Sequence, residues 1–344
     1  MSELKYATTA QRMQQLKVAK LFQHNSKPLT ALDFDDSGVY CVTASADECI
    51  NIYDCKAGNH KKLLYSKKYG VHLTRFTHSN KAILYASTKE NDIIRYLSVH
   101  DNKFISYFIG HKSQVVTLEM SPVDDTFLSG SVDDSIRLYD VRSHHCQGCL
   151  GVKGRPSVGY DNKGLVFALG IADKVRLYDL RNFDKGPFST FAIIDPFFSA
   201  IAYQRNIAPP TWTSLKFSND GKNILITTGG DQHYVIDAFS GELRRRLVGH
   251  VGLGAVAEGL GGDDAGFTPD GRFVIGGSQD GVISIWDIQT PTPAFASIDI
   301  RPLKQLESHT KPSQVVKFNP RYLMMVSGCT DLAFWEPALD NPVL

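Results

Sequence analysis

The chain has 344 residues, 42% of them hydrophobic and 21% charged, which is typical of a globular protein rather than a disordered one. Its 37 Lys and Arg residues against 36 Asp and Glu residues leave a net charge of +1, which argues against the broad positive field needed for non-specific nucleic-acid binding. The chain starts without a secretory signal pattern and has no apolar run of membrane-spanning length, so we expect an intracellular protein with no membrane contact.

The first residues, 1–15, are expected to form an N-terminal arm. The next segment, LKVAKLFQH at 16–24, resembles KFISYFIGH and ELRRRLVGH further along the chain, each of which follows a complete repeat. Residues 16–24 instead precede the first complete repeat. We therefore predict that they supply the outer strand of the last repeat, which would hide two unpaired strand edges.

A motif of small residues, an Asp turn, alternating β-branched residues and a final aromatic residue recurs seven times. Its best copies are TASADECINIYD, SGSVDDSIRLYD and GGSQDGVISIWD, which end at Asp54, Asp140 and Asp287. Weaker copies lie at 86–97, 168–179, 227–238 and 327–336. An apolar strand and a turn precede most copies, and a segment ending in His precedes several of these strands, so each repeat holds four short strands.

This frame resembles the WD-repeat family and predicts an all-β, seven-bladed WD-repeat β-propeller over residues 16–336. Residues 337–344 are expected to form a C-terminal tail. Two insertions are predicted, one at 182–211 before blade five and one at 251–266 inside blade six. Long loops in compact folds are often functional, so either insertion could contact a partner.

Three His–Asp combinations could be mistaken for catalytic pairs. They are His111 with Asp133, His250 with Asp280, and His309 with Asp331. Their repetition favours a structural frame, because in WD blades such a His bonds the turn Asp, which is linked through Ser or Thr to the aromatic residue of the third strand. Trp286 and Trp335 are the aromatic ends in blades six and seven, whereas Tyr139 leaves the last bond of blade three in doubt.

Residues 144–149 (HHCQGC) are the one metal-like cluster. Zinc prefers four ligands, and four within six residues would be strained, so we interpret this segment as a connection between blades. We find no phosphate-binding loop, hydrolase nucleophile or metalloprotease motif. The sequence therefore predicts no catalytic residue, no metal and no cofactor.

Two D-x-R boxes end consecutive blades, with Asp140 and Arg142 in the first and Asp179 and Arg181 in the second. They resemble the motif of propellers that serve as substrate receptors of cullin-based ubiquitin ligases. An Arg at this place can pair with an acid across an interface or only with its own Asp. We favour local pairing and keep the receptor function as the alternative hypothesis.

Basic residues are concentrated at Lys61–Lys62, Lys67–Lys68 and Arg244–Arg246. Charge runs are usually solvated, but a basic patch on a neutral propeller also suits acidic or phosphorylated peptides. Lys67, Lys68 and Tyr69 are our candidates for partner binding.

Several blocks are similar to a narrower group. They include LLYSKKYGV (63–71), IIRYLSVHDNKFISYFIGH (93–111), EMSPVDDTFLSGS (119–131) and LYDLRNFDKGPFSTF (177–191). They resemble the nuclear family that comprises the WD-repeat subunit called Swd-two in yeasts and WD-repeat protein eighty-two in animals.

The resemblance implies a non-catalytic scaffold in the nucleus, present as a monomer within hetero-complexes. One such complex is the COMPASS-type histone methyltransferase, whose catalytic subunit it would engage through that subunit's N-terminal region. The other is the cleavage and polyadenylation factor, with its scaffold subunit and protein phosphatase one, which acts in mRNA 3'-end processing and transcription termination. Animal members also connect to the phosphorylated tail of RNA polymerase II. No direct sequence-specific nucleic-acid binding is implied.

Overall fold

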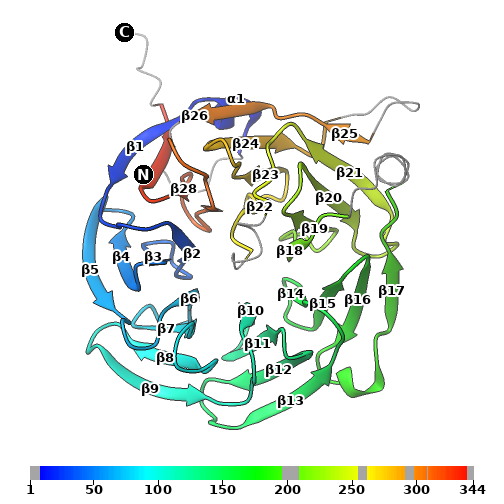
Figure 1. Cartoon of the computed structure of the whole chain (residues 1–344). Helices are drawn as coiled ribbons and strands as arrows, with labels where there is room; N and C mark the ends of the chain where they lie inside the picture. The colour runs from blue at the N-terminus through cyan, green and yellow to red at the C-terminus, as the bar shows by residue number, and fades with distance from the viewer. Residues whose placement is uncertain (1–7, 196–208, 255–261, 291–297, 308, 339–344) are drawn as a thin grey trace.

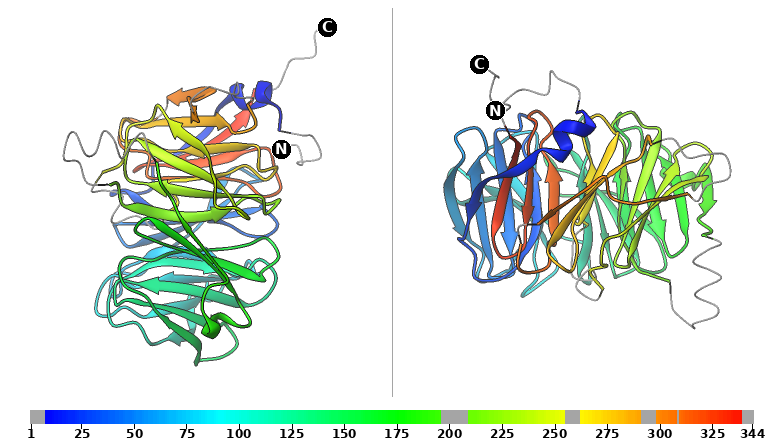
Figure 2. Two further views of the ribbon diagram at one scale, coloured as in Figure 1. Left: turned by 90° about the vertical axis from the view of Figure 1, so that its right-hand side faces the viewer. Right: turned by 90° about the horizontal axis from the view of Figure 1, so that it is seen from above.

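The computed structural model describes residues 8–195, 209–254, 262–290, 298–307 and 309–338. The described chain forms seven sheets that follow one another around a central opening, which confirms the predicted seven-bladed propeller (Figure 1). Seen edge-on, the ring is a thick disc whose strands run between its two faces (Figure 2).

Each blade is numbered in the order in which its innermost strand occurs. Blade one contains β2 (Leu29–Phe34), β3 (Tyr40–Ser45), β4 (Cys49–Asp54) and β5 (Asn59–Tyr65). Blade two contains β6 (His72–Phe76), β7 (Ala82–Ala86), β8 (Ile94–Ser98) and β9 (Lys103–Phe108). Blade three contains β10 (Val115–Met120), β11 (Thr126–Ser131), β12 (Ser135–Asp140) and β13 (Cys146–Gly151).

The remaining blades repeat this order. Blade four contains β14 (Ser157–Tyr160), β15 (Val166–Ile171), β16 (Lys174–Asp179) and β17 (Ser189–Ala192). Blade five contains β18 (Trp212–Phe217), β19 (Asn223–Thr228), β20 (Gln232–Asp237) and β21 (Leu243–Val248), with β25 (Asp299–Ile300) beyond them. Blade six contains β22 (Ala265–Phe267), β23 (Phe273–Gly276), β24 (Val282–Asp287) and β26 (Lys304–Glu307). Blade seven contains β27 (Val315–Phe318), β28 (Met325–Gly328), β29 (Leu332–Pro337) and β1 (Leu16–Phe22).

Burial follows the position of each strand in its blade. The second strands, such as β3, are buried along nearly their whole length, because neighbouring blades cover both of their faces. The outer strand β13 alternates between half-buried and exposed residues, because one of its faces meets solvent. This gradient explains why the inner repeat elements read as apolar runs while the outer segments are rich in Lys and Arg.

The hydrophobic core is divided into seven clusters, one between each pair of neighbouring blades. The cluster between blades one and two, for example, joins Val42 and Ile50 to Ile83 and Tyr85. The cluster between blades seven and one joins Val326 to Leu32, so the last interface is packed like the others. The ring is therefore held by repeated blade-to-blade burial of apolar area, the dominant favourable term in folding.

The N-terminal strand closes the ring as predicted. Strand β1 pairs antiparallel with β29, from Leu16 opposite Pro337 to Phe22 opposite Leu332. A short helix, α1 (Ala10–Gln14), precedes it, and its Met13 is fully buried in the cluster between blades six and seven. In the described chain no helix is long and apolar enough to cross a membrane.

The structure changes the expected segment boundaries. The segment 182–211 is not an insertion throughout, because it contains the 3-10 helix η1 (Phe183–Lys185) and strand β17, which blade four needs as its fourth strand. Residues 196–208 and 255–261 of the two segments, 1–7 of the N-terminal arm and 339–344 of the tail lie outside the described residues. The arm 1–15 includes α1, and the propeller extends one residue past 336, to the end of β29.

Strand β25 was not expected from the sequence. It lies parallel to the outer strand β21, with Asp299 opposite Arg246 and Ile300 opposite Leu247. Ile300 is buried in the cluster between blades five and six. Blade five thus carries a fifth strand on its outer edge.

Candidate interaction sites

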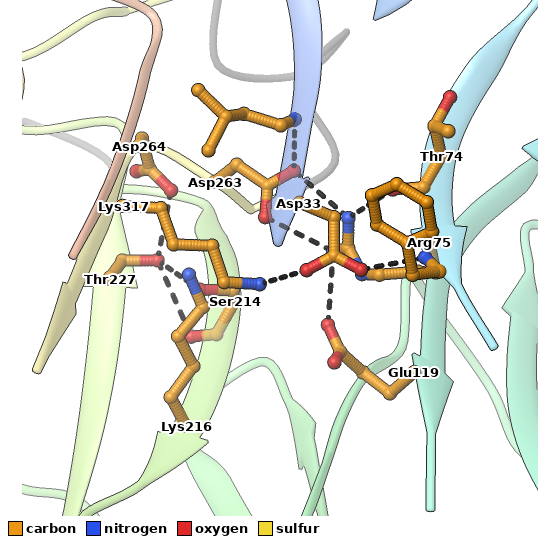
Figure 3. Close-up of polar contacts among 12 residues, drawn as sticks. Asp33, Thr74, Arg75, Glu119, Ser214, Lys216, Thr227, Asp263, Asp264 and Lys317 are labelled. Atoms are coloured by element: carbon orange, nitrogen blue, oxygen red, sulfur yellow. Dashed lines mark hydrogen bonds and ion pairs between the residues drawn. The ribbon is translucent and has the colours of Figure 1, made fainter. Parts of the chain in front are cut away.

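The innermost strands place one equivalent residue each at the central channel. In every blade this residue is the last but one of the innermost strand. The last residue of that strand pairs with the residue seven positions later in the chain, on the second strand. The seven are Asp33, Arg75, Glu119, Gly159, Lys216, Gly266 and Lys317. Figure 3 shows the five charged side chains converging from different blades.

Asp263 joins this ring from the segment that precedes β22. Its two carboxylate oxygens accept hydrogen bonds from the Arg75 guanidinium at 3.0 and 3.1 Å, and one also accepts the Leu32 N–H at 3.1 Å (Figure 3). Arg75 donates a further hydrogen bond to Glu119 at 3.1 Å. A carboxylate from blade six thereby binds blades one and two across the channel.

The other charges of the channel are also satisfied. The ammonium group of Lys317 lies 2.6 Å from one oxygen of Asp33, and the other oxygen accepts the Phe76 N–H at 2.8 Å. Lys216 donates to the carbonyl oxygen of Ala265 at 2.6 Å. Three cations (Arg75, Lys216 and Lys317) and three carboxylates (Asp33, Glu119 and Asp263) form this ring, and Asp264 lies beside it.

Burial and pairing act in opposite directions on these groups. Burial works against the charge of Asp263, but Arg75 and Lys216 outweigh it and hold the pKa of Asp263 below its ordinary value. The neighbouring Asp264 accepts hydrogen bonds from Thr213 at 2.8 Å and from Thr227 at 3.3 Å. Burial dominates there and raises the pKa of Asp264. The channel opens into a cavity of about 680 Å³, whose lining also includes Asp35, Asp36, Asp161 and Arg321.

In blade three the predicted His–Asp pair is present. The Nδ1 atom of His111 lies 3.2 Å from an oxygen of Asp133, and its Nε2 lies 2.8 Å from the hydroxyl of Ser129. Burial opposes ionisation of Asp133, yet hydrogen bonds from Ser135 and from the Lys112 N–H hold its pKa at about 2. The Tyr139 hydroxyl is buried without a hydrogen bond among the described residues, so the relay ends at Ser129.

In blade seven the relay reaches the aromatic residue but omits the acid. His309 Nε2 lies 2.8 Å from the Ser327 hydroxyl, which accepts a hydrogen bond from Trp335 Nε1 at 2.7 Å. Asp331 instead accepts a hydrogen bond from Gln23 at 3.2 Å, near the closing strand β1.

The frame expected in blade six was wrong. His250 bonds the Gly230 carbonyl oxygen at 3.2 Å rather than Asp280, and Trp286 donates to the Val248 carbonyl oxygen at 3.0 Å. The reason is visible in the strand register, because Gly276 occupies the position that Ser327 holds in blade seven. Without that hydroxyl no relay can form, and a Cβ at Gly276 would lie only 3.0 Å from the Trp286 ring.

The metal-like segment 144–149 does not assemble a set of metal ligands. Strand β13 bulges between Cys146 and Gly148, so Cys146 and Cys149 lie opposite Tyr139 and Arg137 of β12. His144 Nδ1 lies 2.8 Å from the Ser106 hydroxyl of blade two. Among the described residues no group of three or more His, Cys, Asp or Glu side chains is arranged to hold a metal ion.

The two D-x-R boxes differ from each other. Arg142 makes two hydrogen bonds to its own Asp140, at 3.0 and 2.7 Å, which is the local pairing we favoured. In the second box Asp179 accepts the backbone N–H of Arg181 at 2.9 Å and the Asn182 amide at 3.1 Å.

The candidate residues Lys67, Lys68 and Tyr69 lie where blade one passes into blade two. The ammonium group of Lys67 lies 5.0 Å from the ring centre of Tyr65, and that of Lys68 lies 5.2 Å from the ring centre of Tyr69. The Tyr69 ring also covers the guanidinium of Arg95 at 3.4 Å. Arg95, which we had not singled out, is 3% exposed and forms the base of this surface.

These features define the class of the protein, a WD-repeat β-propeller. The model of the WD domain, G-beta repeat, matches residues 15–54, 102–140 and 241–287.

Whole-chain relatives narrow the class. The chain is 42% identical to WD repeat-containing protein 82 of Drosophila melanogaster, over 94% of this chain and 95% of that protein. It is 35% identical to COMPASS component SWD2 of Saccharomyces cerevisiae, over 93% and 94% of the two chains. It is 34% identical to Set1 complex component swd2 of Schizosaccharomyces pombe, over 89% and 92%. The chain belongs to this family of WD repeat-containing protein 82 and Swd2 proteins, as its sequence blocks indicated.

Proposed function

We propose that this chain is a non-catalytic scaffold subunit of a nuclear histone methyltransferase complex of the COMPASS type. The observation that carries the proposal is the match over almost the whole chain to two relatives that are named as components of the Set1 complex and of COMPASS. The two matches cover 89% and 93% of the chain, so they span the propeller rather than a single blade.

The propeller suits this role for a physical reason. Its seven inter-blade cores form a closed ring, so its side of an interface is ordered before a partner arrives. Little conformational entropy is then lost on binding, which leaves more of the contact energy as affinity. The most suggestive residues for catalysis, His111 and His309, are engaged in hydrogen bonds that hold strands together.

The proposal extends to named partners. We expect the chain to bind the N-terminal region of the methyltransferase, and to serve also the cleavage and polyadenylation factor with its scaffold and phosphatase subunits. The phosphorylated tail of RNA polymerase II is a further expected partner, because lysines beside tyrosines can meet phosphate groups.

Affinity purification of the tagged chain from nuclear extract, followed by mass spectrometry, tests this function. We expect the methyltransferase and its associated subunits, the polyadenylation scaffold with protein phosphatase one, or both sets. Extract from untagged cells is the control. Recovery of neither set would contradict the proposal, and recovery of a cullin-ligase adaptor in their place would favour the alternative.

A further inference from the structure

Blade five shows how an outer strand of this propeller binds an acidic, extended segment. Arg246 on β21 is 4% exposed and binds two carboxylates. Asp299 of the added strand β25 lies 2.6 Å from Arg246 Nε, and Asp195 lies 2.9 Å from its Nη1. Tyr234, opposite Arg246 on the neighbouring strand, donates a hydrogen bond to Asp195 at 3.3 Å.

Blade two also pairs an Arg with a Tyr, but here the Arg lies on the third strand and the Tyr on the outer strand. Both outer strands bulge at one residue, Arg244 in β21 and Ile105 in β9. Counted from that bulge, Tyr107 occupies the place of Arg246, and Arg95 opposite it occupies the place of Tyr234.

Arg95 has no carboxylate partner among the described residues. It donates to the Ser87 hydroxyl at 2.9 Å and to the Asn91 side chain at 3.2 Å. Three aromatic rings surround its guanidinium. The ring centres of Tyr69, Phe104 and Tyr107 lie 3.4, 5.4 and 5.2 Å from the guanidinium carbon. Two acids match the cation of blade five, whereas neutral polar groups and aromatic faces match the one in blade two. The outer edge of β9 pairs with no further strand in the described chain.

The surface around Arg95 is positive and partly apolar. Residues 59–70 contain four lysines and no acid. Tyr107 and Ile109 are large exposed side chains, and Ile109 is 69% exposed. We call the surface of Lys67, Lys68, Tyr69, Tyr107 and Ile109 the blade-two edge.

We infer that the blade-two edge binds an extended, acidic segment of a partner protein, which adds to β9 as β25 adds to β21. Its backbone would pair with the free edge of β9, as in β-strand addition. Its carboxylates would face Lys67 and Lys68 beside Arg95, and its apolar side chains would cover Tyr107 and Ile109. The inference rests on the proposed scaffold function and names one docking surface for it.

Site-specific photo-crosslinking tests the location and the chemistry of the partner. A benzoylphenylalanine replaces Ile109 in the tagged full chain, and a control variant carries it at Phe239, which is 80% exposed on blade five. In the affinity-purified assembly we expect Ile109, and not Phe239, to crosslink to a complex subunit at a segment of net negative charge. A crosslink to a second copy of this chain, to a segment without net negative charge, or to no subunit would overturn the inference.

Charge-reversal variants test whether the lysines of the blade-two edge bind the acidic segment. The double variant Lys67→Glu, Lys68→Glu should weaken binding of a synthetic peptide of alternating Glu and Ile about tenfold or more, as measured by fluorescence anisotropy. The double variant Lys163→Glu, Lys174→Glu changes the charge equally on the exposed surface of blade four and should bind like the wild type. Equal affinity of the two variants, with unchanged melting temperatures, would refute the docking surface.

A failure of this inference can be distinguished from a failure of the proposed function. If the wild-type chain recovers methyltransferase or polyadenylation subunits while the blade-two edge neither crosslinks nor binds the peptide, only this inference fails. If the wild type recovers no such subunit, the proposed function fails, and the peptide measurement still decides whether the edge binds acidic strands.

Discussion

The buried ion-pair network of Asp263 stabilises the ring at the scale of single residues. Asp263 is 1% exposed and binds the Arg75 guanidinium with both oxygens, so its removal would leave that buried cation paired with Glu119 alone. Breaking such a pair costs about 3–5 kcal/mol. We expect Asp263→Asn to lower the free energy of unfolding by about that amount in urea titrations.

Asp264→Asn is the matched control, because burial already favours the neutral form of Asp264 and an amide oxygen can still accept from Thr213. Its cost should be clearly smaller. Equal costs for the two variants would mean that the pairing with Arg75 does not matter.

Buried histidines predict that acid weakens the fold. Burial lowers the pKa of His72 and of His309 to about 4, against 6.5 in the unfolded chain. The unfolded state therefore binds more protons below pH 6.5, and stability falls as the pH drops from about 6.5 towards 4, by about 1.4 kcal/mol per histidine for each pH unit.

Urea unfolding at pH 7.5 and 5.5 measures this slope. The variant His309→Gln should show a shallower loss than the wild type, whereas His100→Gln, which changes an exposed histidine, should not. An identical slope in all three proteins would show that His309 is not buried in its neutral form.

At the residue scale the sequence predicted the His–Asp frame only in part. His111 pairs with Asp133 and Ser129 in blade three, whereas His309 of blade seven bonds Ser327 and its Asp331 accepts from Gln23. The prediction for blade six was wrong because Gly276 stands where blade seven has the hydroxyl of Ser327. An alignment of the repeats at Ser327 would have revealed this difference. The sequence did not predict the charged channel residues, although each occupies the same position in its repeat. A single charged residue near the end of an apolar strand is common and does not indicate a site by itself.

At the element scale, the ring depends on its N-terminal segment. Met13 of α1 is fully buried, and large-to-small changes at such sites cost about 2–5 kcal/mol. We expect Met13→Ala to lower the melting temperature by several degrees in calorimetry. Gln14→Ala, an exposed change in the same helix, is the control and should have almost no effect.

Elements were predictable where a repeat defined them. Strand β1 was foreseen because residues 16–24 match other outer strands and precede the first complete blade. Strand β25 was not, because its two residues carry no periodic pattern and its pairing with Arg246 depends on tertiary structure. The same holds for β17, whose four residues lie in a segment rich in Pro and Phe.

At the scale of the whole molecule, the propeller combines a rigid interior with an uneven rim. Charges in the channel pair between blades, so they fix the blades relative to one another. Outer strands differ from blade to blade, since blade five carries its own acidic strand while blade two presents lysines and aromatic rings. Such differences allow one closed ring to present distinct surfaces to different subunits.

Native mass spectrometry of the purified chain mixed with the purified N-terminal region of the methyltransferase tests the central claim most directly. The account predicts a one-to-one complex, which the variant Lys163→Glu, Lys174→Glu also forms. It also predicts that the chain alone transfers no methyl group to a histone H3 peptide. A chain that stays free or binds only itself in this mixture, or that methylates the peptide by itself, would contradict a non-catalytic scaffold of this complex.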